Sequence, residues 1–134
     1  MPRILIVDDE ENLRKSLAIG LKVEGFESIQ AESGAEAIEM LNRGLVVDVV
    51  LVDLMMPGLN GLDVARHITR VHPDIVTVLC SAYHLSLRQL DRSNCGAIGF
   101  VPKPYVIADL ARYLREKIAS PLSPRSEQLV KEIA

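Results

Sequence analysis

Five polar residues in this chain could together carry out chemistry. Asp8 and Asp9 follow the apolar run RILIV, and Asp53 follows VVDVVLV. Ser81 follows IVTVLC, and Lys103 follows AIGFVP. Such runs are typical of strands that are buried on both faces of a parallel sheet. Because the carboxyl ends of parallel strands meet at one edge of the sheet, we expect these five side chains to converge.

Three carboxylates at one edge repel one another, unless one is protonated or a divalent cation lies between them. Carboxylate oxygens are hard ligands, and a site of this size suits Mg²⁺. One carboxylate beside the metal can attack phosphorus and form an aspartyl-phosphate, and Asp53 is the candidate nucleophile. Ser81 and Lys103 would hold the phosphoryl oxygens as charge develops. Taken alone, Asp8 and Asp9 could equally cap the helix that follows them.

The pattern of the chain predicts an α/β fold, in which five strands alternate with five helices in a doubly wound, five-stranded parallel sheet. A leucine every four residues and the capping box Ser33–Glu36 indicate the first two helices. A weak, polar helix is expected over Leu85–Asn94, and a stronger one over Ala108–Ile118. The predicted strands are Arg3–Val7, Phe26–Ala31, Asp48–Asp53, Ile75–Cys80 and Ala97–Val101.

Composition narrows the class of protein. The 134 residues are 49% hydrophobic and 25% charged, with a formal net charge of −3, which suits one globular domain without a nucleic-acid-binding face. No apolar stretch is long enough to cross a membrane. Two isolated cysteines, Cys80 and Cys95, suit a reduced, cytoplasmic protein. We expect a domain over residues 1–119, and a linker-like tail over 120–134 that either frays or begins a missing output region.

The segments ILIVDDEEN, LVDLMMPGLNG, LCSAY and GFVPKPY resemble, in sequence and in order, the response regulator receiver domains of two-component signalling, the CheY-like superfamily. The resemblance covers Pro2–Ala119 and implies the flavodoxin-like strand order 2-1-3-4-5. It also implies that Asp53 is the phosphoacceptor. Mg²⁺ would be bound by Asp9, by Asp53 and by the backbone carbonyl of Met55, with Asp8 helping through water.

The same resemblance gives roles to four further residues. Ser81 and Lys103 would contact the phosphoryl group, and the peptide bond between Lys103 and Pro104 would be cis. Phe100 matches the aromatic residue of the family's switch, and an ordinary core residue is the alternative interpretation.

The resemblance implies a signalling protein that catalyses only its own phosphorylation and slow dephosphorylation. A sensor histidine kinase or a phosphotransfer protein would be the donor, and transcription is the expected output. The face of helix four, strand five and helix five would switch, and a homodimer through that face is a further option. The alternative is a stand-alone receiver that acts as a phosphorelay or interaction module. A phosphohydrolase would need a second acid where Met55 stands, and Met55 and Tyr83 are expected to shield the phosphate from water.

Overall fold

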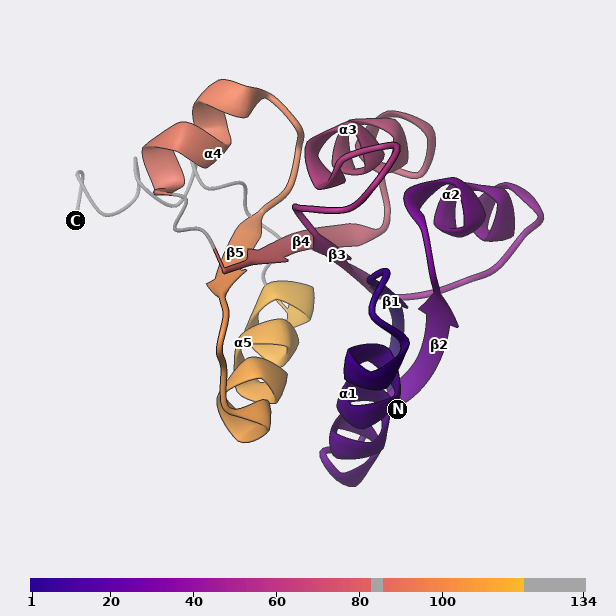
Figure 1. Ribbon diagram of the computed structural model, residues 1–134, viewed down its shortest axis with the longest axis vertical. Coiled ribbons are helices and arrows are strands. Elements are labelled where there is room, and N and C mark those ends of the chain that lie inside the picture. The colour runs from indigo at the N-terminus through magenta and orange to yellow at the C-terminus, as the bar shows by residue number, and fades with distance from the viewer. Residues whose placement is uncertain (83–85, 120–134) are drawn as a thin grey trace.

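The computed structural model describes residues 1–82 and 86–119 of the chain. Its centre is one parallel sheet in the strand order β2-β1-β3-β4-β5, as expected (Figure 1). The strands are β1 (Arg3–Val7), β2 (Glu27–Ala31), β3 (Val49–Asp53), β4 (Val76–Ser81) and β5 (Gly99–Pro102).

Within the described residues, four helices connect the strands, a fifth follows β5, and together they cover both faces of the sheet. Helices α1 and α5 lie on one face, and α2, α3 and α4 lie on the other (Figure 1). This doubly wound arrangement confirms the predicted fold class. The helices are α1 (Glu11–Val23), α2 (Gly34–Asn42), α3 (Gly61–Val71), α4 (Leu87–Ser93) and α5 (Ile107–Ala119).

The three central strands are almost completely buried because helices cover them on both sides. Side chains alternate between the faces, so Ile4 and Ile6 of β1 pack toward α1 and α5. Leu5 and Val7 pack into the second cluster, on the side of α2, α3 and α4. Two apolar layers therefore hold the central strands rigidly, together with the residues at their carboxyl ends.

Two predicted boundaries were wrong near the end of the sheet. β5 begins at Gly99 rather than at Ala97, and α4 ends at Ser93. Asn94 and Gly96, which lie between them, have positive φ angles of 53° and 80°. This left-handed turn ends α4 before Asn94, and the pairing of β5 with β4 begins only at Gly99, opposite Val78.

The prediction that Ser33 caps the beginning of α2 is confirmed. The Ser33 side chain accepts a hydrogen bond from the Glu36 backbone N–H at 3.1 Å. Asn60 caps α3 in the same way, accepting from the Asp63 N–H at 3.0 Å. The beginnings of both helices are therefore satisfied locally, by the residue types that favour such positions.

The outer edge of β5 is closed by a side chain from α5. The Phe100 N–H donates a hydrogen bond to the Tyr113 hydroxyl at 3.0 Å. A Cβ atom at Gly99 would lie 2.3 Å from the same hydroxyl oxygen, so Gly99 leaves the space that Tyr113 fills. At the opposite edge, β1 is the only strand among residues 1–82 and 86–119 that pairs with β2.

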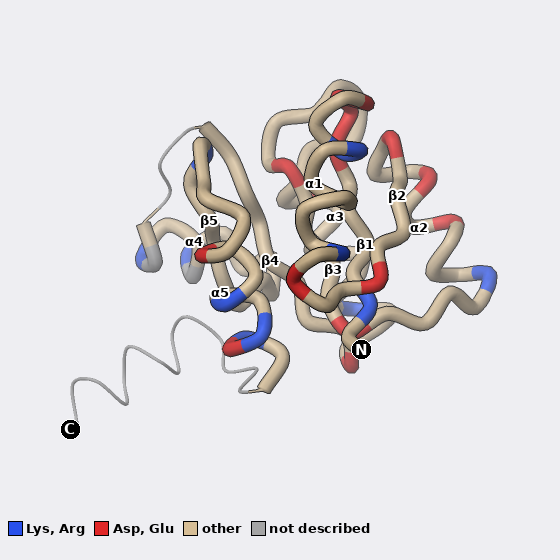
Figure 2. Tube along the Cα trace, turned by 90° about the horizontal axis from the view of Figure 1, so that it is seen from below, with Lys and Arg blue, Asp and Glu red and all other residues tan. Residues whose placement is uncertain are grey.

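Charges are spread over the helices. Figure 2 shows acidic and basic positions interspersed along α1 and α2, in agreement with the small net charge. Within residues 1–82 and 86–119, no helix combines the length and the apolar character that a membrane span requires. The predicted tail, residues 120–134, lies outside the described part of the chain, and the predicted domain boundary stays a prediction.

Candidate functional site

Three carboxylates meet at the carboxyl edge of the sheet. Oxygen atoms from Asp8, Asp9 and Asp53 all lie within 4.8 Å of one another. The register of the parallel strands pairs Val7 with Val52, so the aspartates that follow these two residues are neighbours. Asp8 and Asp53 are only 5% and 7% exposed, whereas Asp9 is exposed. The cluster therefore has two buried members and one that faces water.

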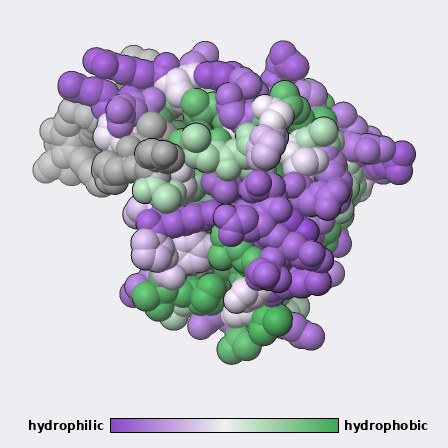
Figure 3. All heavy atoms as spheres, viewed as in Figure 1, coloured by the Kyte–Doolittle hydropathy of each residue, from purple (hydrophilic) through white to green (hydrophobic). Residues whose placement is uncertain are grey.

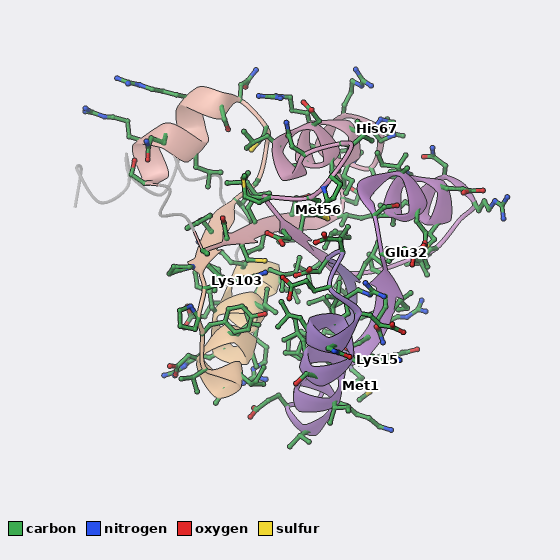
Figure 4. All side chains as sticks on the ribbon, viewed as in Figure 1. Met1, Lys15, Glu32, Met56, His67 and Lys103 are labelled. Atoms are coloured by element: carbon green, nitrogen blue, oxygen red, sulfur yellow. The ribbon has the colours of Figure 1, made fainter. Side chains whose placement is uncertain are left out.

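Lys103 completes this cluster from the connection between β5 and α5. Its Nζ lies 3.0 Å from Asp8 Oδ2 and 3.3 Å from Asp53 Oδ2. Figure 4 shows the side chain pointing toward oxygens that lie between α5 and α1. Its backbone N–H donates to the Ser81 carbonyl at 2.8 Å, and the Lys103–Pro104 peptide bond is cis, as expected. The end of β4 therefore fixes the starting point of the lysine side chain.

A buried arginine supports Asp8. The Asp8 carbonyl accepts a hydrogen bond from Arg14 Nη1 at 2.6 Å, and Asp8 Oδ1 accepts from the Glu10 N–H at 2.9 Å. Arg14 was not predicted from the sequence, because leucines spaced by four residues indicated the inner face of α1. The buried face is in fact Arg14, Leu17 and Leu21, which follows the three-and-four spacing of a helix.

The loop after β3 folds tightly against Asp53. Asp53 Oδ1 accepts a hydrogen bond from the Met55 N–H at 3.2 Å, and the Gly61 N–H donates to the Leu54 carbonyl at 3.0 Å. A Cβ atom at Gly61 would lie 2.6 Å from the Asp53 carbonyl oxygen. Gly61 therefore supports the site, because only a residue without a side chain fits so close to the Asp53 backbone.

Substituting Gly61 by alanine is expected to lower the stability of the fold by about 1–3 kcal/mol, the usual cost of overpacking. The added methyl group must push the Asp53 backbone aside. Urea denaturation measures the loss of stability. Gly20→Ala is the matched control, because its Cβ would meet only the side chain of Ile107, at 3.0 Å. Equal stabilities of the two variants would contradict this explanation.

The other predicted residues lie where the register requires. Ser81 ends β4, is 1% exposed, and follows Cys80, which is the partner of Asp53 in the sheet. Phe100 is half-buried and packs against the core on the side of α2, α3 and α4, a position that fits both a switch and a core residue. The Met55 side chain is 57% exposed. Tyr83 lies outside the described residues, so its shielding role stays a prediction.

Burial and charge act in opposite directions within the cluster. Burial raises the pKa of the Asp53 carboxyl above its ordinary value, although the Met55 N–H and the Lys103 ammonium both act to lower it. Burial also opposes the charge of Lys103, but the hydrogen bond to Asp8 and the nearby negative charges raise its pKa overall. Burial raises the pKa of the Cys80 thiol to about 12, so Cys80 is a neutral core residue. Lys103 is therefore a cation beside the Asp53 carboxyl, which burial makes costly to ionise.

The donor set of the cluster fits a divalent cation. Three carboxylates face one ammonium group, which leaves excess negative charge in a partly dehydrated site. All of the available ligand atoms are oxygens, the type that Mg²⁺ prefers. Asp8, Asp9 and Asp53 are the residues that would hold the ion.

Comparisons with known protein sequences give one consistent family. The family model described as "Response regulator receiver domain" matches residues 4–115. Sensory transduction protein RegX3 of Mycobacterium tuberculosis is 34% identical over 115 residues, which are 86% of this chain and 50% of that protein. Sensor kinase CckA of Brucella abortus is 31% identical over 116 residues, which are 86% of this chain and 12% of that protein. The chain therefore spans half or less of the length of these curated relatives.

Solved structures give the same result. The structure of response regulator TrrA from Thermotoga maritima, in complex with Mg(2+)-BeF, is 37% identical with a TM-score of 0.76, covering 87% of this chain and 98% of that one. A response regulator receiver domain from Clostridium thermocellum is 26% identical with a TM-score of 0.79, covering 89% and 95% of the two chains. The fold of this chain thus has close structural counterparts among response regulators.

Proposed function

This chain belongs to the family of response regulator receiver domains, and from that premise we propose that Asp53 accepts a phosphoryl group from a phosphohistidine. The donor is a sensor histidine kinase or a phosphotransfer protein. The observation that carries the proposal is the cluster of Asp8, Asp9 and Asp53, with Lys103 Nζ 3.3 Å from the Asp53 carboxylate. The acidic members supply metal ligands, and the lysine supplies a fixed positive charge.

The chemical step is a displacement at phosphorus. An oxygen of the Asp53 carboxylate donates an electron pair and forms a P–O bond, while the P–N bond of the phosphohistidine breaks. The electrons of that bond leave with the imidazole. Mg²⁺, when bound, neutralises the carboxylates and the phosphoryl oxygens. Lys103 and Ser81 stabilise the negative charge on the phosphoryl group, and the packed β3 strand holds Asp53 in place.

A small phosphodonor tests this proposal without the cognate kinase. Incubation with acetyl phosphate and Mg²⁺ should add the mass of one phosphoryl group, and EDTA should prevent the addition. Asp53→Asn should add none, because an amide is not a nucleophile of this kind. Asp74→Asn is the matched control, since Asp74 is exposed in the turn before β4 and lies outside the cluster. Uptake by Asp53→Asn at the wild-type level would refute the assignment.

The output is proposed to act through the face formed by α4, β5 and α5. Phe100 belongs to β5 and pairs with Leu79 of β4, two residues before Ser81, which supports a role in transmitting the signal from the site to this face. Transcription is the proposed consequence of this change. Two alternatives to this output remain. The phosphorylated chain could form a homodimer through the same face, or it could act as a stand-alone phosphorelay. Hydrogen exchange over residues 86–94 that does not respond to phosphorylation would favour the phosphorelay.

The phosphorylated form is proposed to be long-lived. Water must attack in line with the aspartyl oxygen, and Met55 provides no side-chain donor or acceptor that could orient it. Met55→Asn combined with Tyr83→Glu should therefore release phosphate faster than the parent. Loss of phosphate from the purified phosphoprotein measures the rate. Equal half-lives would show that these two side chains do not shield the site.

A further inference from the structure

A groove of about 560 Å³ lies between α1 and the edge strand β2, on the flank of the molecule away from α5. This volume lies within the range of ligand sites in proteins. Its floor is apolar, with Phe26 and Ala18, and it is distinct from the acidic cluster. The residues that line it are Met1, Lys15, Ala18, Ile19, Lys22, Phe26, Glu27, Ser28 and Gln30.

The strand beside the groove has backbone groups that pair with nothing in the described part of the chain. The Glu27 N–H donates to the Pro2 carbonyl and the Ala31 carbonyl accepts from the Asp8 N–H, so these two residues turn their backbone groups toward β1. In a parallel ladder this direction alternates along the strand. The backbone N–H and C=O groups of Ser28 and Gln30 therefore point away from the sheet, where a further strand would pair with them.

Side chains around the groove also lack partners of their own. The Ser28 hydroxyl is buried from solvent and has no hydrogen bond among the described residues. Ile19 and Met1 are 70% and 77% exposed, although both are apolar. Figure 3 shows hydrophobic atoms at the lower end of the molecule, where α1 ends. An open strand edge, an unpaired hydroxyl and an apolar rim thus occur together.

The charges of the groove select the chemistry of its occupant. Lys15 and Lys22 lie on the same helix and both line the groove. Lys15 Nζ also forms an ion pair with Oε1 of the exposed Glu11, at 2.9 Å. Glu27 is the acidic residue that lines the groove, and its Oε2 forms an ion pair with Arg3 Nε at 3.5 Å. Seven residues of helix separate the two lysines by about 10.5 Å along α1. Acidic side chains four residues apart on a strand are separated by about 13 Å, which the long lysine side chains can span.

We propose that this groove binds an extended acidic peptide as a sixth strand on β2. An apolar residue of the peptide packs over Phe26 and Ile19. The residues two positions before it and two positions after it are acidic, and they pair with Lys15 and Lys22. A second copy of this chain fits less well, because its own β2 would turn Ser28 and Gln30 toward the groove. Those side chains are neither apolar nor acidic.

A fluorescent heptapeptide tests the proposal. It carries valine at its centre, glutamate at its second and sixth positions, and threonine elsewhere. Fluorescence polarisation should show saturable binding, and the amide signals of Ser28 and Gln30 should shift in NMR spectra. Replacing both glutamates by lysines should abolish binding. Equal binding of the two peptides, or amide shifts confined to other surfaces, would overturn the proposal.

Variants of the protein locate the contact. Ser28→Pro removes an outward N–H on an edge strand that tolerates proline, and it should weaken binding about tenfold. Ile19→Glu should weaken it by a similar factor. Val46→Glu is the matched control, since Val46 is 71% exposed and does not line the groove. Unchanged affinity of Ile19→Glu would refute the site, even if Ser28→Pro failed to fold. A dimer that Ser28→Pro dissociates in sedimentation would assign this edge to a second copy and also overturn the proposal.

Discussion

Replacing Lys103 by alanine is expected to lower the rate of phosphoryl uptake by about a hundredfold or more and to destabilise the metal-free fold. The rate falls because a preorganised cation beside the developing charge typically contributes a factor of about 10²–10³. Stability falls because Asp8 and Asp53 are buried and lose the ammonium group that lies 3.0 and 3.3 Å away. Removing one partner of a buried pair costs about 3 kcal/mol or more.

Two measurements separate these effects. Mass spectrometry after incubation with acetyl phosphate gives the rate of uptake, and urea denaturation in EDTA gives the free energy of unfolding. Lys15→Ala is the matched control, because its ammonium group forms only an exposed pair with Glu11 on α1. The interpretation fails if Lys103→Ala matches this control in both measurements.

Mg²⁺ is expected to stabilise the protein, and the gain should be greatest at neutral pH. Burial raises the pKa of Asp53 above its ordinary value, so the folded chain binds this proton more tightly than the unfolded chain. Its contribution to stability is therefore present below the ordinary aspartate pKa. It is lost as the pH rises through the raised, folded value. Without metal, stability should decline over that interval, and a bound cation should offset the decline.

Thermal melts with Mg²⁺ and with EDTA test this expectation across a pH series. At a magnesium concentration ten times Kd, the stabilisation should reach about 1.4 kcal/mol, a shift of several degrees. Asp53→Asn should be more stable than the parent in EDTA at neutral pH, because it removes a buried charge without removing volume. It should also gain less from Mg²⁺. Identical midpoints with and without the metal, at every pH, would contradict the proposed site.

The positions of the five chemical residues could be predicted because each ends an apolar run. A buried parallel strand requires such a run, and the fold then brings the strand ends together without further information. Asp8, Asp53 and Lys103 meet for this reason, and their distances agree with the expected convergence. The strand order could not be predicted in this way, because alternation of strands and helices allows other orders of strands. The order was predicted only from the family resemblance.

Residues that support the site were harder to predict. Arg14 is charged, so a search for apolar faces assigns it to solvent, yet its guanidinium holds the Asp8 carbonyl. Gly61 matters through the 2.6 Å approach of its missing Cβ to the Asp53 carbonyl, and no spacing in the sequence reveals such a contact. The groove beside β2 depends on which edge is left open, and that also requires the folded chain.

The two edges of the sheet differ in a way that limits self-association. β5 is short, includes Pro102, and has its Phe100 N–H occupied by the Tyr113 hydroxyl, whereas β2 leaves the backbone of Ser28 unpaired. A sheet with two open edges could extend from molecule to molecule into a fibre. A sheet with one open edge can pair only once, and assembly through strands then stops at two molecules. Tyr113 thus blocks the pairing of a further strand with β5. Tyr113→Ala should therefore increase aggregation at high concentration.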